Sequence, residues 1–160
     1  MTWQGSTTVR DRIFAALPYL LPLIDGLGFG FDRFLFEQFP ALRVIFLPLV
    51  PLLQIYRGVP FAGLIIFFGL FLLVVRNTDI NYFIRLNTMQ AILIDIALIL
   101  CSLVVPFLAN VIQVPLVVET LYNTIFLAIL IACVYAVSSS LMGRDSEMPL
   151  ITEAARMQVR

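Results

Sequence analysis

Long apolar runs separated by short polar segments dominate this chain. The run over residues 59–75 contains no charged residue, and the runs over 89–109 and 114–137 contain one each, Asp95 and Glu119. About 20 helical residues are needed to cross a hydrocarbon core roughly 30 Å thick. These runs predict membrane-spanning helices over 59–76, 86–109 and 117–140.

Two further apolar runs are interrupted. The run over residues 41–56 contains an arginine and two prolines but approaches spanning length, so 41–57 is counted as a fourth span. Residues 13–24 would extend only about 18 Å as a helix, and Pro18 and Pro22 would bend it. We therefore expect residues 1–40 to form an interfacial segment, 41–142 to form the membrane domain, and the charged residues 143–160 to form a mobile polar tail.

Short connections make consecutive helices antiparallel neighbours, so the predicted fold is an all-α integral membrane four-helix bundle with an N-terminal interfacial helical segment. Four crossings place nine of the ten arginines on the side of both termini. The positive-inside rule assigns that side to the cytoplasm or its stromal equivalent. Only Arg57 would lie on the other side; Arg76 and Arg85 belong to the cytoplasmic group.

Composition excludes several classes of function. With 61% hydrophobic residues and 12% charged residues, the chain cannot be an ordinary water-soluble domain. A net charge of zero argues against a nucleic-acid partner. The chain has neither lysine nor histidine, which removes histidine-based catalysis and metal ligation, and Cys101 and Cys133 are expected to be free thiols. We expect no metal, no cofactor and no catalytic residue.

Asp95 is the most informative residue of the third predicted span. An ionised carboxylate at mid-membrane costs about 2.5–3.5 kcal/mol, so Asp95 should be protonated, paired, or turned toward water or another helix. Thr88, Asp95 and Ser102 recur every seven residues and should form one polar seam that faces protein. The seam either lines a hydrophilic path or bonds the helices together.

Polar residues also gather where the third span begins. Arg85, Asn87 and Gln90 fit either a polar vestibule or an arginine reaching the headgroups beside a helix-start asparagine. Asp25 and Gly26 open a glycine-rich stretch that lacks the lysine and preceding strand of a phosphate loop. We interpret that stretch as a hinge loop of the interfacial segment.

Three segments together resemble one family. They are LPYLLPLIDGLGFG (17–30), VPFAGLIIFFGLFLLVVRN (59–77) and FIRLNTMQAILIDI (83–96). They look like the twenty-kilodalton subunit of the translocon at the inner envelope membrane of chloroplasts and its cyanobacterial relatives. The resemblance implies a four-helix membrane protein of the protein-import machinery, proposed to form or line its channel. Asp25, Arg85, Asn87, Gln90 and Asp95 belong to these motifs without an assigned role.

The resemblance favours a subunit that binds or lines a path for polypeptide without chemistry of its own. Because no transit extension is visible, we expect a cyanobacterial or organelle-encoded relative in a cyanobacterial plasma or thylakoid membrane or the plastid inner envelope. A filled four-helix bundle is too small to enclose a passenger, so its expected partners are lipid, passengers and further membrane subunits in a homo- or hetero-oligomer. The alternatives are a proton-coupled or small-solute transporter using Asp95, and an assembly factor.

Overall fold

The computed structural model describes residues 7–30 and 34–159, and every regular element in these ranges is helical. Four helices there are long and apolar enough to span a membrane. The expected all-α membrane fold is confirmed. The helices that meet the length criterion are Val9–Gly30, Ala41–Gly58, Tyr82–Ile112 and Pro115–Leu141.

The N-terminal helix is longer than the sequence suggested. It consists of α1 (Val9–Ala16), the 3₁₀ turn η1 (Leu17–Tyr19) and α2 (Leu20–Gly30) without a break. Thr8 and Asp11 form a reciprocal capping box at its start. Pro18 stands at the beginning of the 3₁₀ turn, where its missing N–H is tolerated. The expectation that this region is too short to cross was therefore wrong: it forms 22 helical residues.

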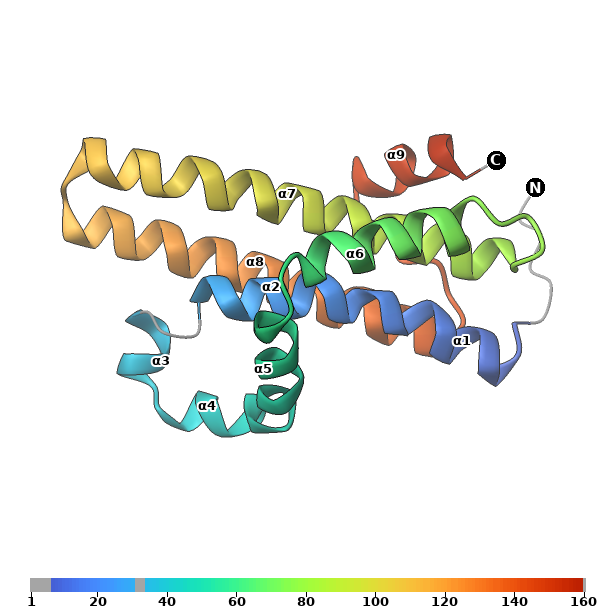
Figure 1. Cartoon of the computed structure of the whole chain (residues 1–160), viewed down its shortest axis with the longest axis horizontal. Helices are drawn as coiled ribbons and strands as arrows, with labels where there is room; N and C mark the ends of the chain where they lie inside the picture. Colours follow the sequence, from blue (N-terminus) through green and yellow to red (C-terminus); the bar gives the residue numbers. More distant parts are fainter. Residues whose placement is uncertain (1–6, 31–33, 160) are drawn as a thin grey trace.

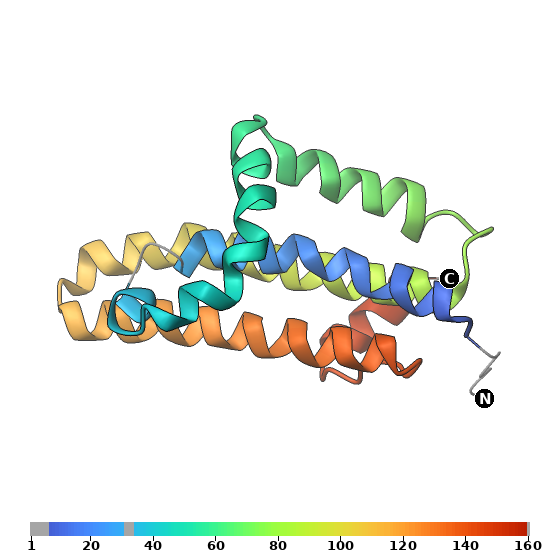
Figure 2. The ribbon, with the colours of Figure 1, turned by 90° about the horizontal axis from the view of Figure 1, so that it is seen from below.

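The next segment turns away from the bundle. It comprises α3 (Phe34–Gln38), α4 (Ala41–Phe46), the 3₁₀ turn η2 (Leu47–Leu49) and α5 (Val50–Gly58). Figures 1 and 2 show α5 running across the axis of the long helices rather than along it. Only 6% of the Ala41–Gly58 window is buried, so this segment has the length of a span without the packing of a bundle helix.

A short apolar helix returns along the bundle. Phe61 adopts a left-handed conformation, φ 59°, and reverses the chain after α5. α6 (Ala62–Gly69) then continues into the π-helical turns of η3 (Leu70–Val75). The 14 residues from Ala62 to Val75 are fewer than the 18 predicted for 59–76, and fewer than a perpendicular helix needs to span alone.

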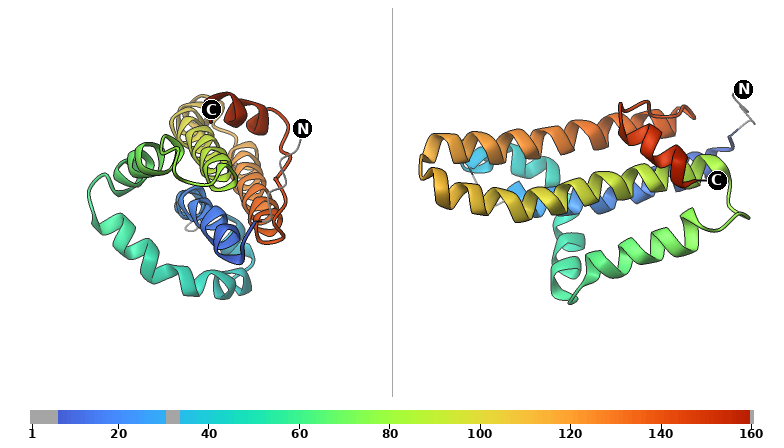
Figure 3. Two further views of the ribbon diagram at one scale, coloured as in Figure 1. Left: turned by 90° about the vertical axis from the view of Figure 1, so that its right-hand side faces the viewer. Right: turned by 90° about the horizontal axis from the view of Figure 1, so that it is seen from above.

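The longest helices form an antiparallel hairpin. α7 (Tyr82–Ile112) is capped by Gln113, whose left-handed φ of 50° closes the helix, and α8 (Pro115–Leu141) begins with proline in its first turn. The continuous α1–η1–α2 helix packs against both, so three helices form the filled core (Figure 3). α6 and η3 flank this core on the α7 side (Figure 1).

The C-terminal region is structured, which corrects the expected mobile tail. α9 (Ile151–Gln158) packs against the beginning of α7. Ala155 and Val159 are buried in an apolar cluster with Val75, Leu86 and Met89. The C-terminal region therefore has polar residues and also an apolar face, which packs against α7.

α1 begins, and α9 lies, at the same end of the bundle (Figure 1). The α6–α7 connection reaches this end too, so arginines gather there. The helix α1–η1–α2 carries the chain away from this end before α4 begins (Figure 1). Arg43 on α4 therefore does not fall with this group, contrary to the expectation from the sequence. The described arginines in the helices and connections at this end are Arg10, Arg12, Arg76, Arg85, Arg144 and Arg156. Arg33 and Arg160, which the sequence also assigned to this side, lie outside the described residues.

Candidate functional site

A buried hydrogen-bond network occupies the bundle near the chain ends. The Tyr19 hydroxyl lies 2.9 Å from Gln90 Oε1 and 3.1 Å from Asn87 Oδ1. Ser140 donates to Asn87 Oδ1 at 2.8 Å. Tyr19, Asn87, Gln90 and Ser140 are at most 1% exposed. These side chains join α7 to η1 and α8 and line neither of the two cavities described below.

The same network holds the segment before α9. Gln90 Nε2 donates to the Ser146 carbonyl at 2.9 Å and to Thr152 Oγ1 at 3.0 Å. Ser146 Oγ donates to Gln90 Oε1 at 2.6 Å. Met148 N–H completes it by donating to Thr152 Oγ1 at 2.8 Å. Gln90 thus fastens the C-terminal region to the membrane bundle, in a place where the sequence also allowed a polar vestibule.

Arg85 is an internal group rather than a headgroup contact. Its side chain is 7% exposed and its Nε donates to the Val75 carbonyl at 2.8 Å. Arg76, by contrast, is exposed at the end of η3. The two arginines that the sequence grouped together therefore have different environments.

The expected Thr88–Asp95–Ser102 seam does not face protein along its whole length. Thr88 and Asp95 are buried, with Thr88 Oγ1 donating to the Ile84 carbonyl at 2.8 Å. Ser102 is exposed, and its hydroxyl donates to the Ile99 carbonyl at 2.7 Å. Because its own helix supplies the acceptor, Ser102 can face lipid without an interhelical partner.

Asp25 and Gly26 lie inside α2, so the expected hinge loop is wrong at these positions. A Cβ on Gly26 would lie 3.0 Å from Ile129 Cγ2, which shows how closely α2 approaches α8. The Tyr56 hydroxyl of α5 donates to Asp25 Oδ2 at 2.8 Å. Tyr56 and Tyr19 were not selected from the sequence, although a tyrosine within an apolar helix needs a polar partner for its hydroxyl.

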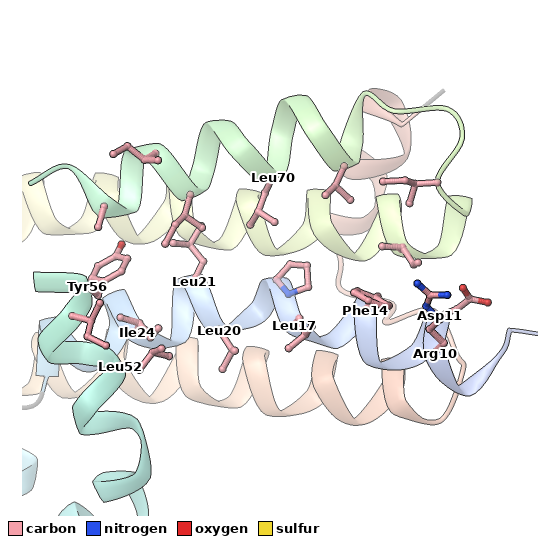
Figure 4. A pocket seen from close by; sticks show the side chains of 18 of the residues that line it. Arg10, Asp11, Phe14, Leu17, Leu20, Leu21, Ile24, Leu52, Tyr56 and Leu70 are labelled. Atoms are coloured by element: carbon pink, nitrogen blue, oxygen red, sulfur yellow. The ribbon is translucent and has the colours of Figure 1, made fainter. Parts of the chain in front are cut away.

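A large apolar groove separates the N-terminal helix from α5 and α6. Its volume is about 1180 Å³. Figure 4 shows Leu17, Leu20 and Ile24 on one side, with Leu52 and Leu70 across from or beside them. Further groove residues, Phe14, Ile55, Val59 and Ile66, are also apolar, and Arg10 and Asp11 lie at the end near the chain termini (Figure 4).

A smaller cavity of about 420 Å³ lies on the other side of α6. Asp25 of α2 and Asp95 of α7 both line it, together with Gly63 of α6. Asp95 is 1% exposed, and its Oδ1 has no hydrogen-bond partner among the described residues. Two acidic groups, distant in sequence, are thus brought to one cavity.

Gly63 permits the close approach of α5 and α6. A Cβ on Gly63 would overlap the Tyr56 hydroxyl and lie 3.7 Å from Asp25 Oδ2, whereas a Cβ on Gly69 would meet nothing within 4 Å. We expect Gly63→Ala to displace Tyr56 from Asp25 and lower the free energy of unfolding by about 1–2 kcal/mol. Gly69→Ala should be neutral or stabilise by up to about 1 kcal/mol. Thermal unfolding in detergent measures both variants; equal destabilisation would contradict this role of Gly63.

The fold and its cavities define a polytopic helical membrane protein with a filled core and an apolar groove beside it. Comparison with known families identifies it further. The family model described as "Chloroplast import apparatus Tic20-like" matches residues 8–155. The chain belongs to the Tic20 family.

The similarity to individual relatives extends over nearly the whole chain. A Tic20 family protein of Synechocystis sp. is 50% identical, with 100% of this chain and 99% of the relative aligned. Protein TIC 20-v, chloroplastic, of Arabidopsis thaliana is 36% identical, and the alignment covers 98% of this chain and 74% of the relative. Protein TIC 20-II, chloroplastic, of the same plant is 35% identical, and the alignment covers 96% of this chain and 74% of the relative. The chain therefore resembles both cyanobacterial and plastid members.

Proposed function

We propose that this chain is a membrane subunit of a protein-translocation machinery and that its groove accommodates an apolar segment of a passing polypeptide. The subunit performs no chemistry of its own. Family membership supports the general role. The proposal that the subunit binds a passing polypeptide depends on the groove between the N-terminal helix and α5–α6.

The size and lining of the groove support a chain-like ligand. Small-molecule pockets measure roughly 300–1,000 Å³, and this groove exceeds them at about 1180 Å³. Leu17 and Ile66 stand on opposite sides of the groove and are 48% and 41% exposed. Apolar side chains on both walls would favour an apolar or amphipathic segment over a hydrophilic one.

The groove is not a closed channel, so neighbouring subunits or further copies of this chain would complete a path across the membrane.

Asp79 and Arg76 lie in the α6–α7 connection at the arginine-rich end. The gathering of arginines at this end supports an orientation with both chain termini on the cytoplasmic or stromal side. An assembly factor would use the same groove for a fixed partner.

Site-specific photocrosslinking tests the groove as a polypeptide contact. A photoreactive residue at Leu17 or at Ile66 should form adducts with a radiolabelled precursor arrested during translocation in membranes. Val134 of α8 is a matched control, because it is apolar and 61% exposed and does not line the groove. Adducts should form from the two groove positions and disappear when excess unlabelled precursor competes.

Two outcomes would count against the polypeptide path. Adducts of equal strength from Val134 would show unspecific contact with the precursor. Adducts only with a fixed membrane subunit, unchanged by the precursor, would favour the assembly role instead.

A further inference from the structure

The cavity beneath α6 has an acidic floor and apolar walls. Asp25 and Asp95 supply its charged groups, and the other described lining residues are apolar side chains and Gly63. The Asp25 and Asp95 carboxyl groups lie close enough to interact with each other across the α2–α7 contact. No basic residue is among the described residues that line this space.

The two carboxyl groups differ in their hydrogen bonds. Asp25 accepts a hydrogen bond from Tyr56 at 2.8 Å. Asp95 Oδ1, on a side chain that is 99% buried, has no donor in the described structure. A buried acceptor without a donor costs about 1–3 kcal/mol, and more when it is charged. The cavity therefore holds an acceptor that a ligand with an N–H donor would satisfy.

The cavity opens through the apolar outer surface of the bundle. Four of its lining residues are large hydrophobic side chains that are 45–56% exposed: Leu64, Phe68, Ile99 and Leu100. This surface lies on α6 and the middle of α7, where the surrounding medium is lipid or another membrane protein. A ligand approaching from there must have an apolar body.

The geometry points to a binding site for a lysine or arginine side chain carried by an apolar helix of another polypeptide, with Asp95 and Asp25 as its acceptors. A positive charge complements the two acidic groups, and its N–H groups would supply the missing donor to Asp95 Oδ1. The apolar rim would cover the stem of the cationic side chain and the helix that carries it.

A metal ion fits this cavity less well. Among the described residues, no group of three or more His, Cys, Asp and Glu side chains is arranged to hold one. Hard cations need six or more oxygen ligands or retained water, and apolar walls supply neither. A side-chain ammonium or guanidinium brings its own hydrogen bonds and apolar stem.

Binding of synthetic apolar helices to the purified protein in lipid nanodiscs tests the site. One peptide is a membrane-spanning leucine–alanine helix with a single central lysine, and its matched control has norleucine at that position. A photoreactive residue at Leu100 reports occupancy. The lysine peptide should form roughly tenfold more adduct at equal concentration, which corresponds to one charge-assisted hydrogen bond.

The second part of the peptide-binding experiment replaces the two carboxyl acceptors. Asp95→Asn and Asp25→Asn should each reduce the preference for the lysine peptide toward the norleucine level, and Glu119→Gln, outside the cavity, should preserve it. Equal adduct from both peptides with the unaltered protein would overturn the proposal and indicate a purely apolar contact. A preference that persists in both aspartate variants would also overturn it. The comparison of peptides does not depend on whether a variant folds.

Photocrosslinking from Leu100 in native membranes identifies the polypeptide that supplies the cationic side chain. Its result does not depend on whether the groove contacts the precursor. An adduct at Leu100 that forms without precursor identifies a resident membrane subunit. An adduct that forms only with arrested precursor identifies the passenger. If Leu100 forms an adduct with neither a resident subunit nor an arrested precursor, the proposal is contradicted, even where Leu17 and Ile66 contact the precursor.

Discussion

Replacing Gln90 with leucine is expected to detach the C-terminal region and lower the free energy of unfolding by about 3 kcal/mol or more. The substitution removes an amide that donates to Ser146 and Thr152 and accepts from Tyr19 and Ser146. Leucine fills a similar volume, so the effect comes from polar atoms left without partners rather than from a cavity.

The location of these atoms makes the loss large. Tyr19 is 1% exposed and Ser146 is fully buried, so water does not replace the missing amide without opening the structure. The segment that precedes α9 depends on this contact, since the Ser146 carbonyl accepts from both Gln90 and Thr152. We therefore expect local release of residues 143–159 before the helical core unfolds.

Limited proteolysis and thermal unfolding in detergent measure the two parts of this prediction. Gln90→Leu should make the C-terminal region cleavable and lower Tm by roughly 6–12 °C. Gln54→Leu, the same exchange at an exposed position of α5, should change neither. Protection of the C-terminus equal to that of the unaltered protein would show that apolar packing of Ala155 and Val159 is sufficient to hold α9.

The hydrophobic pattern was enough to predict the helical class and the α7–α8 hairpin. The expected spans over 86–109 and 117–140 lie within the helices Tyr82–Ile112 and Pro115–Leu141. The prediction failed at the N-terminus because the helix was limited to the apolar run over 13–24, which Pro18 and Pro22 were expected to bend. A 3₁₀ turn accommodates Pro18. The Thr8 cap also starts the helix at Val9, among polar residues that precede the apolar run.

The sequence indicated Asp95 but not its surroundings. Its neighbours Asp25 and Gly63 come from other helices, so their convergence depends on how α2, α6 and α7 pack. No periodicity within one segment contains that information. The polar tail illustrates the same limit, since the eight residues of α9 form too short a pattern to predict a helix on their own, and α7 supplies the surface against which Ala155 packs.

Arg85→Met is expected to loosen the attachment of η3 to α7, with a loss of about 1–3 kcal/mol in the free energy of unfolding. Arg85 Nε donates to the carbonyl of Val75, the last residue of η3. Val75 is 1% exposed, so its carbonyl would lose this buried donor. The consequence reaches both cavities, because α6 and η3 form a wall of the groove and α6 covers Asp25 and Asp95.

Arg76→Met separates this internal role from attraction to headgroups. Both substitutions remove one guanidinium from the arginine-rich end, but Arg76 is exposed and Arg85 is 7% exposed. Only Arg85→Met should lower Tm, speed amide hydrogen exchange in residues 70–76 and weaken precursor adducts from Ile66. If the two variants behave alike, Arg85 serves as a headgroup anchor, and the wall formed by α6 and η3 is held by apolar packing alone.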